Sequence, residues 1–222
     1  MKSISRKLLG PFVAAVFVCL VLAGSGANSG EESGSKDGSP LSGFSKEERD
    51  KLLKGEPIYQ HVKKENEKGE IEGYGQSVII INKPVDRSFQ IFCEFDKHHL
   101  YFPRKKKSEV IKSWDNKALV HKVFGFYVVD VEYTVLYTVD PEKRRVDYKL
   151  DKDYPHDLEE VEGFFKFEKI DEKHTLFTYA ATKVETGLKV PGFIQDYLTS
   201  RDLPQVARSI KKRVESGGKW EK

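Results

Sequence analysis

The chain has 222 residues, and its 38 lysines and arginines exceed its 35 aspartates and glutamates by three. All of that excess lies within the first 27 residues, so the remainder carries no net charge. Nucleic-acid binding favours a basic domain or a one-sided basic stripe, and nothing in the overall charge of this chain argues for it, so we expect no nucleic-acid partner.

The first 27 residues have the pattern of a signal peptide. Basic residues are followed by an apolar run at 12–23 and by small residues at 24–27. The run is shorter than the roughly 20 apolar residues of a comfortable membrane span, although an uncleaved anchor is the alternative. We therefore expect cleavage after Ala23 or Ala27 and export to the periplasm or the cell exterior. One of the two cysteines would leave with this segment, which leaves the other without a disulfide partner.

A linker and a short extension precede the main domain. Residues 28–44 are rich in Gly and Ser and predict a flexible linker. In 45–69, Ser45 begins a capping-box pattern that predicts a helix to about Lys54. A short strand is expected at 58–63. The apolar contacts of the helix are predicted to be Leu52 and Leu53.

The main domain is expected to span 70–216, with 217–222 as a tail. It begins with a long strand at 71–82, which Pro84 ends. Asp86 is predicted to cap a helix at 87–95, because a short acidic side chain can accept a bond from the first turn. A second helical turn is expected at 98–102. The helix spacing places three aromatic residues on one side, namely Phe89, Phe92 and Phe95.

A run of strands separated by polar turns follows. Apolar and polar residues alternate, as in Val131, Tyr133, Val135, Tyr137 and Val139 against their intervening neighbours. Such spacing predicts hairpins and an antiparallel sheet. The predicted strands are 107–114, 118–129, 131–139, 144–151, 160–170 and 173–184.

The end of the chain is predicted to be helical. A short apolar stripe at 191–198 indicates one helix. Asp202 is placed to cap the last helix, with Pro204 in its first turn, where the missing N–H costs nothing. The apolar face of that helix comprises Leu203, Val206, Ala207, Ile210 and Val214.

In its order of elements and in several short motifs the sequence resembles the START-like superfamily of polyketide cyclases, lipid-transfer proteins and coenzyme-Q-binding proteins. The motifs are Pro84-Val85-Asp86, the segment 96–103, 144–148, 163–167, 190–194 and Leu203-Pro204. The resemblance covers about 70–216. It implies an α+β, helix-grip fold, in which a curved antiparallel sheet wraps around the C-terminal helix and leaves a hydrophobic cavity.

Inward aromatic and aliphatic side chains would line such a cavity. Tyrosines suit this position because each combines an apolar ring with one polar group. The alternative is that these side chains only pack the core. The candidate ligand-binding residues are Tyr133, Val135, Tyr137, Tyr148, Phe165, Phe167, Phe193, Tyr197 and Ile210.

The sequence shows no arrangement typical of a catalytic or metal site. The histidines lack zinc spacing, so we expect no metal, no cofactor and no catalytic residue. His98 and His99 are interpreted as surface residues, and Cys93 as a small buried apolar residue. The basic cluster 104–107 is interpreted as a solvated strand end, with transient contact to acidic lipid head groups as the alternative.

We therefore expect an exported binding or carrier protein for a hydrophobic small molecule, such as a lipid, isoprenoid or quinone-like compound. Burial of apolar ligand surface would supply the binding free energy without a catalytic group. One alternative is a polyketide cyclase or aromatase-like enzyme that uses a few acid–base side chains. Another is a protein-interaction module with a closed core and an exposed apolar patch.

Overall fold

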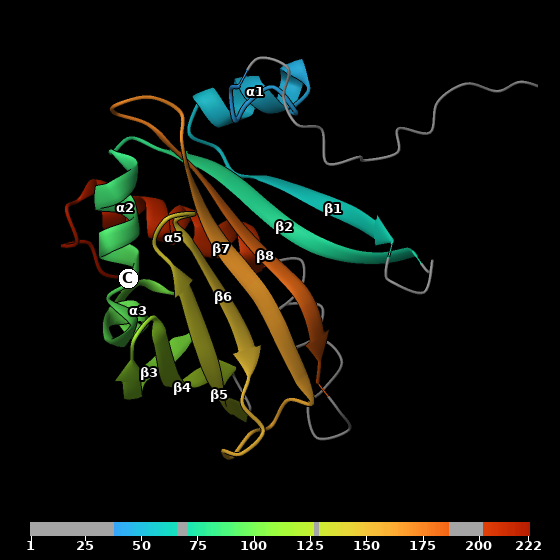
Figure 1. Ribbon diagram of the computed structural model, residues 1–222, viewed down its shortest axis with the longest axis vertical. Coiled ribbons are helices and arrows are strands. Elements are labelled where there is room, and N and C mark those ends of the chain that lie inside the picture. Colours follow the sequence, from blue (N-terminus) through green and yellow to red (C-terminus); the bar gives the residue numbers. More distant parts are fainter. Residues whose placement is uncertain (1–37, 66–70, 127–128, 187–201) are drawn as a thin grey trace, which may run out of the picture.

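A computed structural model describes residues 38–65, 71–126, 129–186 and 202–222. Within these ranges one antiparallel sheet of eight strands curves around a C-terminal helix (Figure 1). The strands are β1 (Ile58–Glu65), β2 (Ile71–Ile81), β3 (Lys105–Trp114), β4 (Lys117–Phe126), β5 (Val129–Asp140), β6 (Arg145–Leu150), β7 (Glu160–Lys169) and β8 (Thr175–Glu185). The helices are α1 (Lys46–Leu53), α2 (Val85–Phe92), α3 (His98–Tyr101) and α5 (Asp202–Glu215), with a 3-10 turn at Phe95–Lys97.

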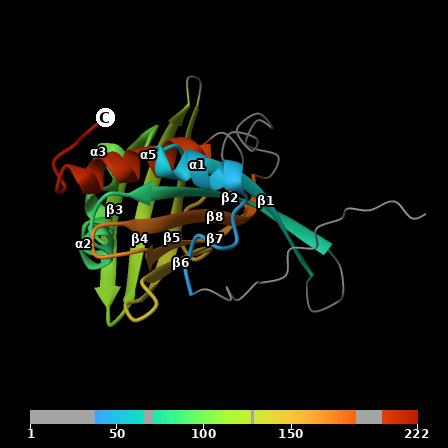
Figure 2. The same ribbon diagram turned by 90° about the horizontal axis from the view of Figure 1, so that it is seen from above.

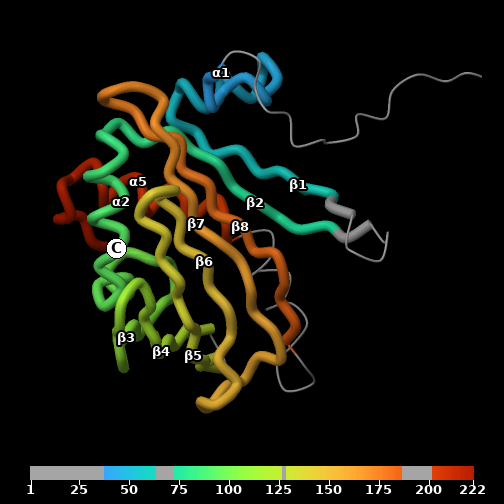
Figure 3. Tube along the Cα trace, in the orientation of Figure 1, coloured from blue at the N-terminus to red at the C-terminus, as the bar shows by residue number. Residues whose placement is uncertain are grey.

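The strand order is β1-β2-β8-β7-β6-β5-β4-β3, so β1 and β3 form the two edges. Strands β3 to β8 follow one another as a meander, and their path can be traced in Figure 3. Strand β2 pairs with β8, for example Val78 opposite Thr178, and this pairing joins two segments of the sheet that are far apart in sequence. Helices α2 and α3 lie between β2 and β3, in the long connection that this order requires.

Helix α5 lies along the inner face of the sheet (Figure 2). Its apolar stripe, Val206, Ala207, Ile210 and Val214, is fully buried against the inward residues of the strands. On β2, Ile79 and Ile81 belong to this inner cluster, whereas Val78 and Ile80 face the other way. There they pack with Leu52 of α1. The alternation of β2 therefore joins two apolar layers, as expected of a strand covered on both faces.

Several local predictions are confirmed. Ser45 and Glu48 form both bonds of the capping box at the start of α1. The long amphipathic C-terminal helix is found at Asp202–Glu215 with Pro204 in its first turn, although Asp202 lies in that turn and was predicted as the cap. The predicted order of the strands is also found, and no bound differs from its prediction by more than three residues. The predicted helix at 191–198 lies outside the described residues.

Other local predictions are wrong. Helix α2 begins at Val85 with Pro84 at the N-cap, because the Pro84 carbonyl accepts the first helical bond from Ser88. Asp86 instead lies in the first turn and accepts a bond from Arg144 at 2.7 Å. Helix α2 ends at Phe92, three residues before its predicted end at Phe95. In α1, Leu53 is 70% exposed, because only the face carrying Leu52 meets the sheet.

Candidate functional site

A small cavity lies inside the fold, between the inner face of the sheet and the start of α5. Its volume is about 30 Å³. Strands β3 to β8 and α5 all contribute to its wall. The lining residues are Phe102, Lys105, Lys122, Phe124, Tyr133, Tyr148, Leu158, Val161, Phe165, Tyr179, Ala181, Val184 and Asp202.

Stacked aromatic rings form one wall of this cavity. The ring of Phe165 stacks on Tyr179 at 4.6 Å between centroids, and the ring of Tyr148 lies 5.3 Å from Phe165. The hydroxyl of Tyr148 donates a hydrogen bond to the Ala180 carbonyl at 3.0 Å. This reach across the sheet requires Gly163, because a Cβ there would lie 2.2 Å from the Tyr148 hydroxyl. Because it has no side chain, Gly163 of β7 leaves the space that the Tyr148 ring occupies in the aromatic wall.

Two lysines are buried in the same cavity. Lys122 is 5% exposed, and its Nζ lies 4.5 Å from the ring centroid of Tyr137 and 5.5 Å from that of Tyr148. Lys105 is 2% exposed, and its Nζ lies 3.7 Å over the ring of Phe102. Aromatic faces attract cations, and this attraction strengthens when water is removed. The lysines are therefore held among ring faces rather than in water.

Burial governs the ionisation of these groups. It lowers the pKa of Lys122 from 10.5 to about 7. The pKa of Lys105 is lowered well below its usual value, first by burial and then by Lys122, while the Asp202 carboxylate acts in the opposite direction. The pKa values of Tyr133 and Tyr148 are raised by burial, so both hydroxyls remain protonated at neutral pH.

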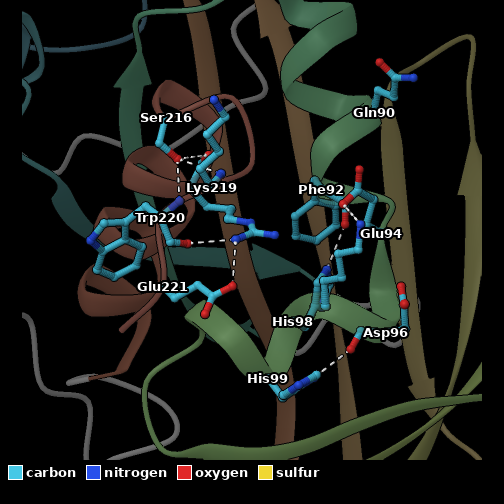
Figure 4. Close-up of polar contacts among 12 residues, drawn as sticks. Gln90, Phe92, Glu94, Asp96, His98, His99, Ser216, Lys219, Trp220 and Glu221 are labelled. Carbon is cyan, nitrogen blue, oxygen red and sulfur yellow. Dashed lines mark hydrogen bonds and ion pairs between the residues drawn. The ribbon is translucent and has the colours of Figure 1, made fainter.

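His98 lies behind the lysines and is completely buried. Its Nε2 contacts the Phe92 carbonyl at 2.8 Å (Figure 4), and because a carbonyl can only accept, Nε2 carries the proton. Burial and the nearby Lys105 lower the pKa of His98, so the ring is neutral. Its Nδ1 and the hydroxyl of Tyr137 are buried without a hydrogen-bond partner.

The last residues of the chain support the start of β3. The guanidinium of Arg213 donates to the Trp220 carbonyl at 2.9 Å (Figure 4). The Glu221 carboxylate forms an ion pair with the same guanidinium at 3.7 Å. Lys222 donates its backbone N–H to Leu100 at 3.0 Å and its amine to the Lys105 carbonyl at 2.7 Å. The C-terminal segment thereby fixes the backbone that carries a cavity lysine.

The predicted ligand-binding residues divide into three groups. Tyr133, Tyr148 and Phe165 line the cavity. Four others are buried in the surrounding core without lining it, namely Val135, Tyr137, Phe167 and Ile210. Phe193 and Tyr197 lie outside the described residues.

Sequence reasoning missed several lining residues, above all Lys122, Lys105, Tyr179 and Asp202. A signal for Lys122 existed, because it occupies the same phase of β4 as Val120 and Phe124, both of which point inward. Lys105 gave no such signal. It follows a left-handed residue, Arg104 (φ 57°), and precedes a register shift, so its side of the sheet is not set by simple alternation.

Two surface interpretations are wrong. His98 is buried because α3 turns it under the sheet against Phe92 and Phe102. The basic cluster 104–107 is not uniformly solvated, since Lys105 points inward. Its neighbours Lys106 and Lys107 are exposed and pair with Asp130 and Glu109.

A larger hollow, about 840 Å³, lies on the outer face of the sheet. Its charged lining is largely paired. Arg145 binds Asp147 and stacks over the ring of Phe164 at 3.8 Å, and Lys149 binds Glu162 at 2.7 Å. Such pairs, within one strand for Arg145 and Asp147 and between strands for Lys149 and Glu162, are ordinary for a solvated sheet face, so we place the candidate site in the inner cavity.

No cluster of His, Cys, Asp and Glu suited to a metal ion occurs among the described residues. In the same part of the chain, no helix combines the length and apolar character needed to cross a membrane.

Comparison with known proteins identifies the fold. No protein-family model and no curated protein matches the sequence. Solved structures do match. A protein of Thermus thermophilus is 15% identical over 64% of this chain and 96% of that chain, with a TM-score of 0.57. A START superfamily protein of Mycobacterium smegmatis is 16% identical over 64% and 96%, with a TM-score of 0.54. Human StAR-related lipid transfer protein 5 is 10% identical over 71% and 82%, with a TM-score of 0.53. This chain therefore has the START-like, helix-grip α+β fold.

Proposed function

We propose that this protein is an exported carrier of a hydrophobic small molecule, a lipid, isoprenoid or quinone-like compound, bound between the sheet and α5. The observation that carries the proposal is the inner cavity, walled by the rings of Tyr133, Tyr148, Phe165 and Tyr179. A fold shared with lipid-transfer proteins supports it. Export rests on the signal-peptide pattern of the sequence, and transient contact with a membrane surface stays a prediction.

The cavity size sets a requirement on binding. A volume of about 30 Å³ has room for about two water molecules. Pockets for drug-sized ligands range from roughly 300 to 1,000 Å³. The lining side chains must therefore move apart when a ligand enters. Burial of roughly 300 Å² of apolar ligand surface would supply about 7 kcal/mol toward that opening.

The test is native mass spectrometry of the purified protein, followed by solvent extraction. We expect a hydrophobic molecule bound near one per chain. Phe165→Trp should reduce its occupancy because the larger ring fills the cavity. Phe164→Trp is the matched control, since Phe164 is the neighbouring residue on β7 and faces outward. A protein that stays ligand-free after incubation with lipid and quinone extracts would contradict the proposal.

A second function, an acid–base enzyme acting on a polyketide-like substrate, is favoured by one observation. Lys122 has a pKa near 7 and lies beside the aromatic wall, and such a group can exchange a proton at neutral pH. An enzyme would release an extracted ligand chemically altered, whereas a carrier would return it unchanged. Mass spectrometry of the ligand before and after incubation with the protein separates the two.

A further inference from the structure

Lys122 is buried, and the part of the chain that the structure describes gives it no opposite charge. Burial is the cause of its low pKa, and no residue described in the structure places a carboxylate within ion-pair distance of its amine. The groups facing the amine are Tyr133 and Tyr137 of β5, Tyr148 of β6, Lys105 of β3 and His98 of α3. A buried cation normally has a counter-ion, because removing a charge from water is costly.

Among the described residues that line the cavity, the charges do not balance. Two lysines, Lys105 and Lys122, and one carboxylate, Asp202, line it. The carboxylate acts on Lys105, and its effect on that lysine opposes burial. His98 is neutral and contributes no charge. If both lysines were charged, the single Asp202 carboxylate would leave one positive charge unmatched. One anion beside Lys122 would remove this excess.

A hydrogen-bond donor lies next to the same position. The Tyr137 hydroxyl is completely buried and has no hydrogen-bond partner, and its ring centroid is 4.5 Å from the Lys122 amine. Burial raises its pKa, so the hydroxyl keeps its proton and can donate. Tyr137 does not line the cavity itself, and its hydroxyl becomes available to a ligand only when the lining side chains move apart. A cation on the cavity wall, a neutral donor near it and stacked aromatic rings around the same cavity suit an anionic head on an apolar body.

We propose that the molecule held in the inner cavity is an anionic amphiphile, and that its carboxylate or phosphate head binds at Lys122, beside Lys105 and Tyr137. This inference rests on the proposed function and names the chemical class of its ligand. The apolar body lies against the rings of Tyr148, Phe165 and Tyr179. Binding of the anion returns the Lys122 amine to its charged form, so the complex takes up a proton above neutral pH.

The test compares three probes of equal chain length, each below its critical micelle concentration: laurate, 1-dodecanol and dodecyl phosphate. Titration calorimetry of the purified protein at pH 8, in two buffers of different ionisation enthalpy, gives affinity and proton uptake. We expect at least one acid to bind about tenfold or more tightly than the alcohol. We also expect uptake of up to about one proton per acid bound and none per alcohol. The tighter acid identifies the head group.

Lys122→Met should reduce the affinity for the acid to that for the alcohol and abolish proton uptake, while leaving alcohol binding in place. Lys117→Met is the matched control, because Lys117 lies on the same strand and is exposed. If dodecanol binds wild type as tightly as both acids, the inference is wrong and the carrier function stands. If the acids keep their preference in Lys122→Met, the inference is also wrong. If none of the probes binds, the inference is wrong, and the experiment with lipid and quinone extracts decides the carrier function.

Discussion

Replacing Lys122 by methionine should stabilise the ligand-free protein. The substitution removes the buried amine but keeps an unbranched side chain that can fill the same space. Burial lowers the pKa of the amine from 10.5 to about 7, and each pKa unit corresponds to about 1.36 kcal/mol. The charged amine therefore reduces the free energy of unfolding by about 5 kcal/mol, of which about 4 kcal/mol applies at pH 7.

The effect has a defined pH dependence. The pKa of Lys122 is lower in the folded protein than in the unfolded chain. The destabilisation by its charge is therefore complete below pH 7 and disappears above pH 10.5. The stability difference between variant and wild type should fall by about 3 kcal/mol from pH 7 to pH 9.5. The pKa of His98 is lowered and the pKa values of the surrounding tyrosines are raised, so these groups stay neutral in this window. The Lys122 amine also lowers the pKa of Lys105, so its removal makes Lys105 less costly to charge and adds to the stability gain of the variant.

Urea unfolding followed by tryptophan fluorescence, at half-unit pH intervals, measures this difference. Lys117→Met serves again as the control and should show no pH-dependent change relative to wild type, because its amine is exposed. A variant less stable than wild type at pH 7, or a difference that does not vary with pH, would refute the reasoning. Either result would mean that the Lys122 amine is hydrated or paired in the folded protein.

Three further outcomes are expected. Gly163→Ala should destabilise the protein by about 3 kcal/mol or more in urea unfolding. The reason is that a Cβ would lie 2.1 Å from the Ala180 carbonyl oxygen and 2.2 Å from the Tyr148 hydroxyl. Stability within about 1 kcal/mol of wild type would show that β7 has room for a methyl group at this position. Ser45→Ala should cost about 1 kcal/mol through loss of the cap, and an unchanged unfolding midpoint would argue that α1 does not contribute to the cooperative fold. Cys93 is partly buried, which raises its pKa to about 12, so iodoacetamide at pH 8 should label its peptide much faster after unfolding, as read by mass spectrometry. Equally fast labelling of the native protein would contradict the raised pKa.

Much of the fold could be predicted because the relevant signals are local. The capping box at Ser45, the alternation in β5 and the apolar stripe of α5 each depend on residues a few positions apart. Their order then points to one arrangement, since the amphipathic last helix must cover the apolar face of the sheet. Where prediction failed locally, as at the start of α2, the helix begins at Val85 with no side-chain cap, so Asp86 falls within its first turn.

The candidate site was less predictable. Aromatic residues in the inward phase of a strand, such as Tyr148 and Phe165, follow from alternation, and both line the cavity. Alternation does not reveal which inward residues border a void and which are packed, so Tyr137 and Phe167 could not be separated from them. That difference depends on sheet curvature and on the depth at which α5 lies.

Sequence by itself thus determined the elements, their order and the apolar faces that meet, because hydrophobic periodicity is a property of neighbouring residues. Only the tertiary structure decided that Lys105 and Lys122 are buried together. The phase of Lys122 on β4 points its side chain inward, but local sequence does not tell whether the amine at the end of that side chain is enclosed or reaches solvent. Its environment, and therefore its pKa, is set by rings from other strands and by the helix that closes over them.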